Sequence, residues 1–142
     1  MNSIQYRFGG FAMPLVNIHL MQGKSAEFRQ KLGQVVYQTM TETINVPPRD
    51  NFQLIIEHDQ AGLVYDPEYL NITRTDGIVI IQITLNEGRT TELKKQFYKR
   101  LAERLQAELN VRMEDVFISL VEVKKENWSF GNGVAQYAES GK

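Results

Sequence analysis

The chain contains two copies of one pattern, displaced from each other by a constant 65 residues. Ile18 in the first copy matches Ile83 in the second, and the offset then holds without a gap for about forty residues. The matched positions include turn, cap and strand residues: Gly23 and Gly88, Lys24 and Arg89, Ser25 and Thr90, Asn45-Val46 and Asn110-Val111, Asp50 and Asp115, and Phe52 and Phe117. A solenoid needs at least about three repeats to be stable, so two copies indicate the duplication of one supersecondary unit.

Each copy is expected to form a strand, a turn, a helix and a second strand. In the first copy, apolar and polar residues alternate over residues 16–20, which is typical of a half-buried strand. Gly23 permits a turn, and Ser25 is a predicted helix N-cap. An apolar stripe at three- and four-residue spacing then predicts a helix from Phe28 to Ile44. Pro47-Pro48 ends that helix, and residues 52–56 are predicted to form the return strand.

The second copy repeats this order. We expect a strand over residues 78–85, a cap at Thr90, a helical stripe from Leu93 to Leu109 and a closing strand over residues 116–123. A strand–helix–strand crossover joins parallel strands in the right-handed sense. The predicted fold class is therefore α/β, with two fused βαβ units giving a four-stranded, mainly parallel-paired sheet and both helices on one face. The other face would stay apolar and uncovered, which a monomer tolerates poorly, so we expect self-association.

Composition excludes several classes of function. The 142-residue chain has a net charge of -1 and no basic run, which disfavours nucleic acid or an anionic membrane as a partner. It has no cysteine and two histidines, so neither a cysteine-ligated nor a multi-histidine metal site is expected, and we expect no cofactor. No apolar run is long enough to span a bilayer, and residues 1–12 do not resemble a signal peptide. We expect a cytoplasmic enzyme or binding domain.

Residues 59–77 separate the two copies and are rich in Gly, Pro, Asp and Asn, which predicts a long surface loop. Loops of this length are often lids or binding elements, although this one could equally be a plain connector.

Three segments of the chain together resemble a known enzyme family. Met13-Pro14 opens a strand-like segment that is followed by Gly23-Lys24-Ser25, and the chain closes with the aromatic and glycine block 128–133 (WSFGNG). These segments resemble the tautomerase superfamily of 4-oxalocrotonate tautomerase. The duplicated length, Asp50, His58 and the Gly88-Arg89-Thr90 turn narrow the resemblance to the malonate semialdehyde decarboxylase branch and its uncharacterised relatives. That branch has two arginines close together before the second helix, whereas Asn86 and Glu87 precede Arg89 here.

The resemblance implies a cofactor-free enzyme whose catalytic group is the amine of an N-terminal proline, which would be Pro14. It also implies a MIF-like trimer with pockets near the subunit boundaries. Burial and nearby cations lower the pKa of such an amine and favour a base, whereas an amine that stays protonated acts as an acid. Both states are left open.

The resemblance also implies roles for other residues. Arg89, just before a predicted helix, would bind a substrate carboxylate, and Lys24 in the equivalent turn of the first copy would serve a second anion contact, although each could instead be a solvated surface cation. Asp50 would activate water or donate a proton, but aspartate is also common in turns, and its repeat partner Asp115 occupies the equivalent turn. The aromatic residues Trp128, Phe130 and Tyr137 would form the apolar wall of the pocket or pack against a neighbouring subunit.

We interpret the remaining candidates as structural. His19 alternates outward on the first strand and His58 ends the second. Gly131-Asn132-Gly133 is too short for a phosphate-binding loop and is predicted to be a turn.

The position of Pro14 raises a question about residues 1–12, because a proline held in an amide bond has no basic nitrogen. Either this N-terminal extension is cleaved or translation starts at Met13, whose methionine would be removed because proline follows; a vector-derived leader would look similar. Gly9-Gly10 can be encoded by a ribosome-binding sequence just before the Met13 codon, which favours a start at Met13. The expected organisation is an extension (1–12) and a single domain (13–142) with repeats at about 14–59 and 78–124 and an aromatic tail.

Three functions follow from these observations. The first is a tautomerase that isomerises a small α-keto acid or enol acid, the second is a decarboxylase or hydratase of the malonate semialdehyde type, and the third is a non-catalytic trimeric protein that has kept the fold. The expected partners are a small carboxylate substrate and two further copies of the chain.

Overall fold

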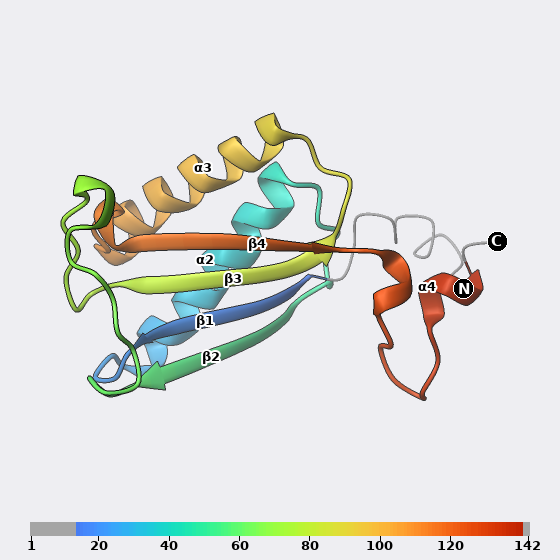
Figure 1. Cartoon of the computed structure of the whole chain (residues 1–142), viewed down its shortest axis with the longest axis horizontal. Coiled ribbons are helices and arrows are strands. Elements are labelled where there is room, and N and C mark those ends of the chain that lie inside the picture. Colours follow the sequence, from blue (N-terminus) through green and yellow to red (C-terminus); the bar gives the residue numbers. More distant parts are fainter. Residues whose placement is uncertain (1–13, 141–142) are drawn as a thin grey trace.

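Two strand–helix–strand units, described in a computed structural model that covers residues 14–140, make up the body of the chain (Figure 1). The first unit comprises β1 (Leu15–Met21), α2 (Ala26–Thr43) and β2 (Phe52–His58), and the second comprises β3 (Val79–Asn86), α3 (Thr91–Leu109) and β4 (Val116–Val123). The predicted strands and helices are confirmed, with ends that differ by one or two residues. Four short elements were not predicted: η2 (Tyr69–Asn71), η3 (Met113–Asp115), η4 (Lys125–Asn127) and α4 (Gln136–Ser140). The predicted extension at residues 1–12 lies outside the described residues.

The four strands form one sheet in the order β2-β1-β3-β4. β1 pairs with β2 in parallel and β3 with β4 in parallel, while the two units meet through an antiparallel pairing of β1 with β3. The predicted mainly parallel pairing is therefore confirmed. The antiparallel junction has a consequence for function: the start of β1 lies beside the end of β3, since Leu15 pairs with Thr84. Equivalent turns of the two copies consequently lie at opposite ends of the sheet.

The two units repeat each other in local detail. The N-caps Ser25 and Thr90 both have extended backbone, and their side chains accept hydrogen bonds from Phe28 N and Leu93 N. After the helices, Asn45 and Asn110 both adopt the left-handed conformation, with φ of 63° and 58°. Asparagine tolerates this region better than most residues because its side chain bonds locally. The same short-range chemistry therefore builds both copies.

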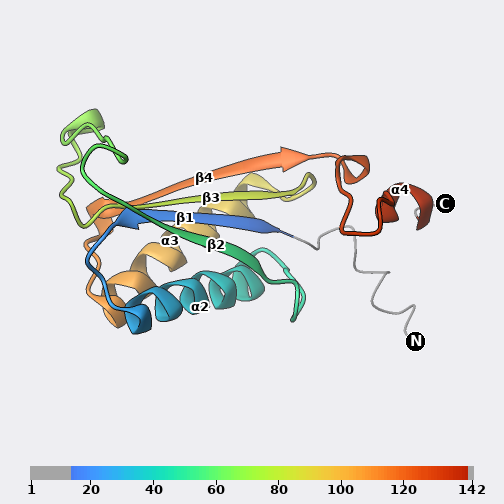
Figure 2. The same ribbon diagram turned by 90° about the horizontal axis from the view of Figure 1, so that it is seen from below.

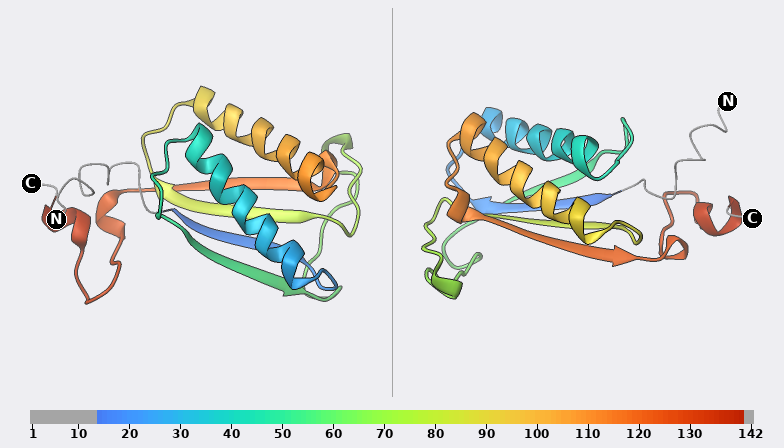
Figure 3. Two further views of the ribbon diagram at one scale, coloured as in Figure 1. Left: turned by 180° about the vertical axis from the view of Figure 1, so that it is seen from behind. Right: turned by 90° about the horizontal axis from the view of Figure 1, so that it is seen from above.

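The core lies between the sheet and the two helices, which cover the same face (Figures 2 and 3). Many of its residues come in repeat-related pairs, and four such pairs are fully buried: Ile18 with Ile83, Leu32 with Phe97, Val36 with Leu101 and Met40 with Leu105. Burying each such side chain contributes roughly 1.5–3 kcal/mol. Within the described residues, no helix is both long enough and apolar enough to cross a bilayer.

The sheet face without helices, called the open face below, is more mixed than predicted. Phe52 and Leu54 on β2 and Phe117 and Val121 on β4 are partly exposed there, at 55%, 53%, 42% and 38%. A row of polar residues crosses the middle of this face, in which Asn17 pairs with Gln82 and Gln82 with Ser119. The open face thus carries partly exposed apolar side chains on its two edge strands together with a central row of hydrogen-bonding groups.

The two ends of the sheet carry different additions. Residues 124–140, called the tail below, extend beyond the sheet at the end where β1 starts, whereas the loop of residues 59–77 lies at the opposite end (Figures 1 and 2). That loop is held by its own contacts and by Asp115, whose carboxylate accepts hydrogen bonds from Thr75 N and Oγ1 at 2.8 and 2.6 Å. Within one chain it therefore cannot cover the region around Pro14.

Candidate active site

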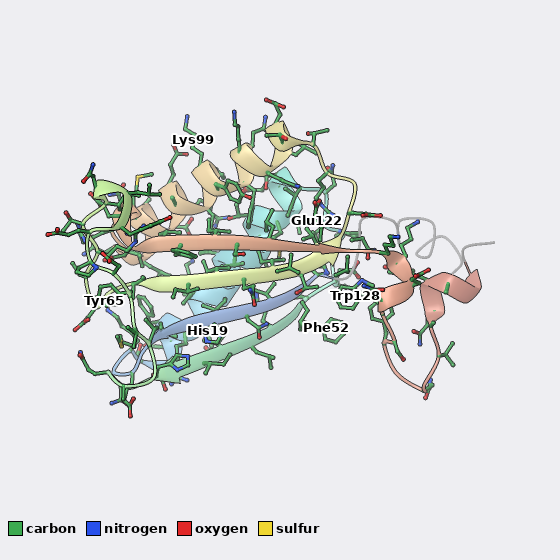
Figure 4. The ribbon with its side chains drawn as sticks, viewed as in Figure 1. His19, Phe52, Tyr65, Lys99, Glu122 and Trp128 are labelled. Atoms are coloured by element: carbon green, nitrogen blue, oxygen red, sulfur yellow. The ribbon has the colours of Figure 1, made fainter. Side chains whose placement is uncertain are left out.

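A cavity of about 240 Å³ opens at the start of β1. It is lined by the buried Pro14 and by Leu15, Phe52, Trp128, Ser129 and Phe130. Figure 4 shows Phe52 and Trp128 at the same end of the sheet, far from Tyr65 in the loop. The structure thus brings Pro14 together with two of the three aromatic residues that were predicted from the sequence.

The aromatic wall of this cavity is built by the tail. The rings of Trp128 and Phe130 stack with centroids 5.4 Å apart, and Phe130 meets Tyr137 edge-on at 5.1 Å. The amide of Gln136 accepts a hydrogen bond from Phe130 N and donates one to Gly131 O, both at 2.9 Å. The predicted turn at residues 131–133 is confirmed, and φ is positive at all three of its residues.

Tyr137 contributes a ring rather than a base. Burial and then the nearby charge of Asp50 raise the pKa of the Tyr137 phenol to about 12. The phenol therefore stays neutral around pH 7. The effect of Asp50 on this pKa also shows that the Asp50 charge acts on the tail.

Arg89 lies at the same end of the sheet, in the turn between β3 and α3. Its residue is 6% exposed, and its guanidinium donates from Nε to Ile44 O at 2.7 Å and from Nη1 to Asn86 O at 3.1 Å. Burial lowers the pKa of Arg89, an effect that the negative charge of Glu122 partly opposes. An arginine remains charged in proteins, so this turn holds a fixed cation at the sheet end where the cavity opens.

Asn86 and Phe52 belong to this site but were not predicted. The Oδ1 atom of Asn86 accepts a hydrogen bond from the indole Nε1 of Trp128 at 2.7 Å. Phe52 pairs with Leu15 across the parallel β1–β2 ladder, which brings its ring beside the start of β1. The alternation of residues in β2 could have placed Phe52 on the open face. Its pairing with Leu15 could not be predicted, because the pattern of one strand does not reveal its register with the next.

The two repeat-related aspartates have different surroundings. Asp115 is 2% exposed and accepts the hydrogen bonds from Thr75 described above, as well as one from Arg112 at 3.5 Å. This is a structural role. Asp50 is only partly buried, it precedes β2 at the Pro14 end of the sheet, and its charge acts on Tyr137 of the tail. The symmetry of the sequence therefore does not extend to the environments of these two carboxylates.

Lys24 is not brought to the cavity within one chain. It follows the end of β1, whereas Pro14 precedes its start, and a seven-residue strand spans roughly 20 Å. Its Nζ atom lies 4.8 Å from the ring centre of Phe28, and Lys24 lines a second cavity of about 380 Å³ beside Asp76 and Asp115. A contribution of Lys24 to the Pro14 site requires a second copy of the chain.

The two histidines contact each other at the Lys24 end of the sheet. His19 Nδ1 lies 2.7 Å from His58 Nε2, and the rings stack with centroids 5.0 Å apart. This arrangement agrees with the predicted structural role. Within residues 14–140, no three His, Asp or Glu side chains come close enough together to hold a metal ion.

Comparison with known proteins identifies one family over most of the described chain. Two family models, both described as "Tautomerase enzyme", match residues 14–71 and residues 50–131. The chain is 49% identical over 127 residues to the probable tautomerase YusQ of Bacillus subtilis (strain 168), a match that covers 89% of this chain and 100% of that protein.

Solved structures show the same fold. The FG41 malonate semialdehyde decarboxylase inhibited by 3-bromopropiolate superposes with a TM-score of 0.82 at 33% identity, covering 90% of this chain and 97% of the other. The wild-type Q0 fused 4-OT symmetric trimer superposes with a TM-score of 0.71 at 24% identity, over 87% and 98% of the two chains.

Proposed function

This chain belongs to the tautomerase family of enzymes, and on that premise we propose that it isomerises a small α-keto acid or enol acid with the amine of Pro14 as its proton-transfer group. The observation that carries the proposal is the position of Pro14 in the wall of an aromatic cavity at the sheet end that also holds Arg89. A tautomerase needs a base, an acid and a group that holds negative charge; in this proposal the Pro14 amine transfers the proton and Arg89 holds the negative charge.

The proposed chemistry moves one proton and leaves no by-product. The Pro14 nitrogen accepts the hydroxyl proton of the enol, the carbonyl forms as the carbon–carbon double bond breaks, and the same proton is delivered to the carbon atom. Apolar rings around an amine disfavour its charged form and so favour the free base near neutral pH. The rings of Phe52, Trp128 and Phe130 supply such surroundings and suit a substrate with an apolar or aromatic substituent.

We assign the substrate carboxylate to Arg89, whose guanidinium is held in a fixed orientation by Ile44 O and Asn86 O. A planar guanidinium can bind a carboxylate through two parallel hydrogen bonds. The carboxylate inhibitor of the structurally similar decarboxylase supports a substrate of this class. Lys24 would add a second cation from a neighbouring subunit.

The mechanism requires Pro14 to be the first residue of the mature chain. We therefore propose that residues 1–13 are absent from the active enzyme and that residues 14–142 form its single domain. Two comparisons support this: a family match begins at residue 14, and the 127-residue alignment contains the whole of the Bacillus relative.

We also propose a homotrimer that packs the open faces together. The partly exposed Phe52, Leu54, Phe117 and Val121 on this face favour burial against other copies. The fused 4-OT, which has the same fold and is a symmetric trimer, supports a trimeric assembly. A cytoplasmic location stays a prediction.

Replacement of Pro14 tests the proposed function directly. The experiment uses enzyme released from a leader so that Pro14 is its first residue, and it follows the ketonisation of phenylenolpyruvate by ultraviolet absorption. Pro14→Ala is expected to lower kcat/KM by about 10²–10⁴-fold, the usual contribution of one proton-transfer group. Pro67→Ala, in the surface loop at the other end of the molecule, serves as the matched control and should retain full activity.

Two outcomes would contradict the proposal. One is full activity of Pro14→Ala, and the other is equal activity of enzyme that still carries residues 1–13, because the nitrogen is then an amide. Intact mass of the protein made from its own gene determines which form is native.

A decarboxylase or hydratase is the second candidate, because the chain is 33% identical to a malonate semialdehyde decarboxylase and because the charge of Asp50 acts on Tyr137 at the Pro14 end. It predicts release of carbon dioxide from malonate semialdehyde and loss of that activity in Asp50→Asn. The presence of Asn86-Glu87 before Arg89 favours the tautomerase over this alternative.

A further inference from the structure

The last residue of β3 carries a buried amide that has no role in the proton transfer proposed above. Asn86 is 1% exposed. Its Oδ1 atom accepts the hydrogen bond from Trp128 Nε1 at 2.7 Å, while its backbone oxygen accepts the one from Arg89 Nη1 at 3.1 Å. One residue thus contacts both the aromatic wall of the cavity and the cation beside it.

The sheet fixes the position of this amide. Asn86 pairs with Val123 in the parallel β3–β4 ladder and follows Leu85, which is fully buried. The next residue, Glu87, donates its backbone N–H to Val123 O at 2.9 Å. A side chain anchored in this way presents its oxygen at a defined place.

The tail, by contrast, extends beyond the sheet (Figures 1 and 3). The ring contacts among Trp128, Phe130 and Tyr137 and the hydrogen bonds of Gln136 to Phe130 and Gly131 all lie within the tail. They shape the tail, whereas the bond from Trp128 to Asn86 joins it to β3. Asn86, which is fixed in the sheet, therefore orients the indole ring that lines the cavity.

We infer that Asn86 is a positioning residue, which holds Trp128 against the Pro14 cavity and ties this wall to the Arg89 turn. The inference rests on the proposed function, since it assigns Trp128 and Arg89 to one active site. Comparison of the two copies indicates that this amide is specific to the copy with the aromatic tail. The equivalent position in the first copy is Met21, whose thioether is a much weaker acceptor, and that copy is followed by the loop.

Asn86→Leu removes the acceptor and keeps the branching and the number of side-chain heavy atoms. The chain has one tryptophan, so its fluorescence and its one indole N–H resonance report on Trp128 alone. We expect the indole resonance to shift and kcat/KM to fall about tenfold or more, because small misplacements of active-site groups are costly. Gln106→Leu replaces an exposed amide near the far end of α3, and it should change neither the indole resonance nor kcat/KM.

Two further variants separate positioning from general support of the fold. Asn86→Asp keeps an acceptor oxygen, so the indole resonance should stay close to that of the wild type. Its charge beside Arg89 should raise KM for an anionic substrate while kcat changes little. Trp128→Phe keeps a ring but removes the donor, and its loss of kcat/KM should not add to that of Asn86→Leu, because both break one interaction.

An unchanged indole resonance in Asn86→Leu would overturn the inference. So would fully additive losses of kcat/KM in a double variant that combines Asn86→Leu with Trp128→Phe. These outcomes differ from a failure of the proposed function. If the processed wild-type enzyme ketonises no enol acid, the proposed function is wrong, whereas the indole resonance still shows whether Asn86 orients Trp128.

Discussion

Arg89 illustrates how one residue serves both the fold and the proposed chemistry. Its guanidinium bridges Ile44 O, beyond the end of α2, and Asn86 O, at the end of β3, so that the two units are joined at this corner. The side chain is almost fully buried, and hydrogen bonds to a buried charge are worth more than those between neutral groups. Lysine cannot reproduce this fork because it carries one nitrogen instead of a planar set of donors.

Arg89→Lys is therefore expected to lower the free energy of unfolding by about 1–3 kcal/mol and to raise KM for an anionic substrate. Urea denaturation followed by Trp128 fluorescence measures the first effect, and enol ketonisation measures the second. Arg100→Lys is the matched control, because the side chain of Arg100 is 50% exposed and lies 3.7 Å from Glu42; it should stay within about 0.5 kcal/mol of wild type. Equal losses in the two variants would contradict the bridging role.

At the scale of elements, the contact between His19 and His58 links the side chains of the paired strands β1 and β2. One ring must be neutral to accept the hydrogen bond, and burial together with the charge of His58 lowers the pKa of His19. The charged groups nearby are the adjacent Asp59, which bonds the turn at Gly62, and Glu57, which is paired with Arg29 across 3.6 Å. The contact thus favours neutral histidine.

The pH dependence of stability follows from this preference. The unfolded chain takes up the His19 proton near pH 6.5 and the folded chain at a lower pH, so the contribution is complete above about 6.5 and is lost as the pH falls. We expect His19→Gln to reduce the difference in unfolding free energy between pH 7.5 and pH 5 by about 1 kcal/mol, the net worth of one hydrogen bond. An unaltered difference in urea titrations would show that the pair does not couple to folding.

The elements themselves could be predicted because their signals are local. Ser25, Thr90, Gly23 and Gly88 mark turns and caps whose geometry depends on a few neighbouring residues. The tail could not be predicted in the same way, since residues 124–140 show neither a strand nor a long helix period. Asn86 was visible only as a departure from the decarboxylase pattern, because its partner Trp128 lies 42 residues away.

For the molecule as a whole, the antiparallel junction of β1 and β3 decides which residues can act together. Lys24 and Arg89 occupy the same turn in the two copies, so the sequence suggested one shared site. The junction instead places them at opposite ends of the sheet: Arg89 beside Pro14, and Lys24 beside Asp76 and Asp115. Spacing along the chain does not contain this reversal, because a fixed offset of 65 residues fits a parallel and an antiparallel junction equally well.

In the proposed trimer, Lys24 would reach the Pro14 site from a neighbouring subunit. The open face provides a test of this trimer. Leu54 is 53% exposed on that face, and Leu54→Lys introduces a charge that an interface between copies would have to desolvate without a partner. We expect wild-type enzyme to sediment at about three times the mass of one chain and Leu54→Lys to sediment as smaller species with reduced ketonisation. Ala107→Lys adds the same charge to an exposed position of α3 and should keep both the assembly and the activity. A fully active wild-type monomer would contradict the trimer, and Lys24 could then take no part in catalysis, because its own strand separates it from Pro14.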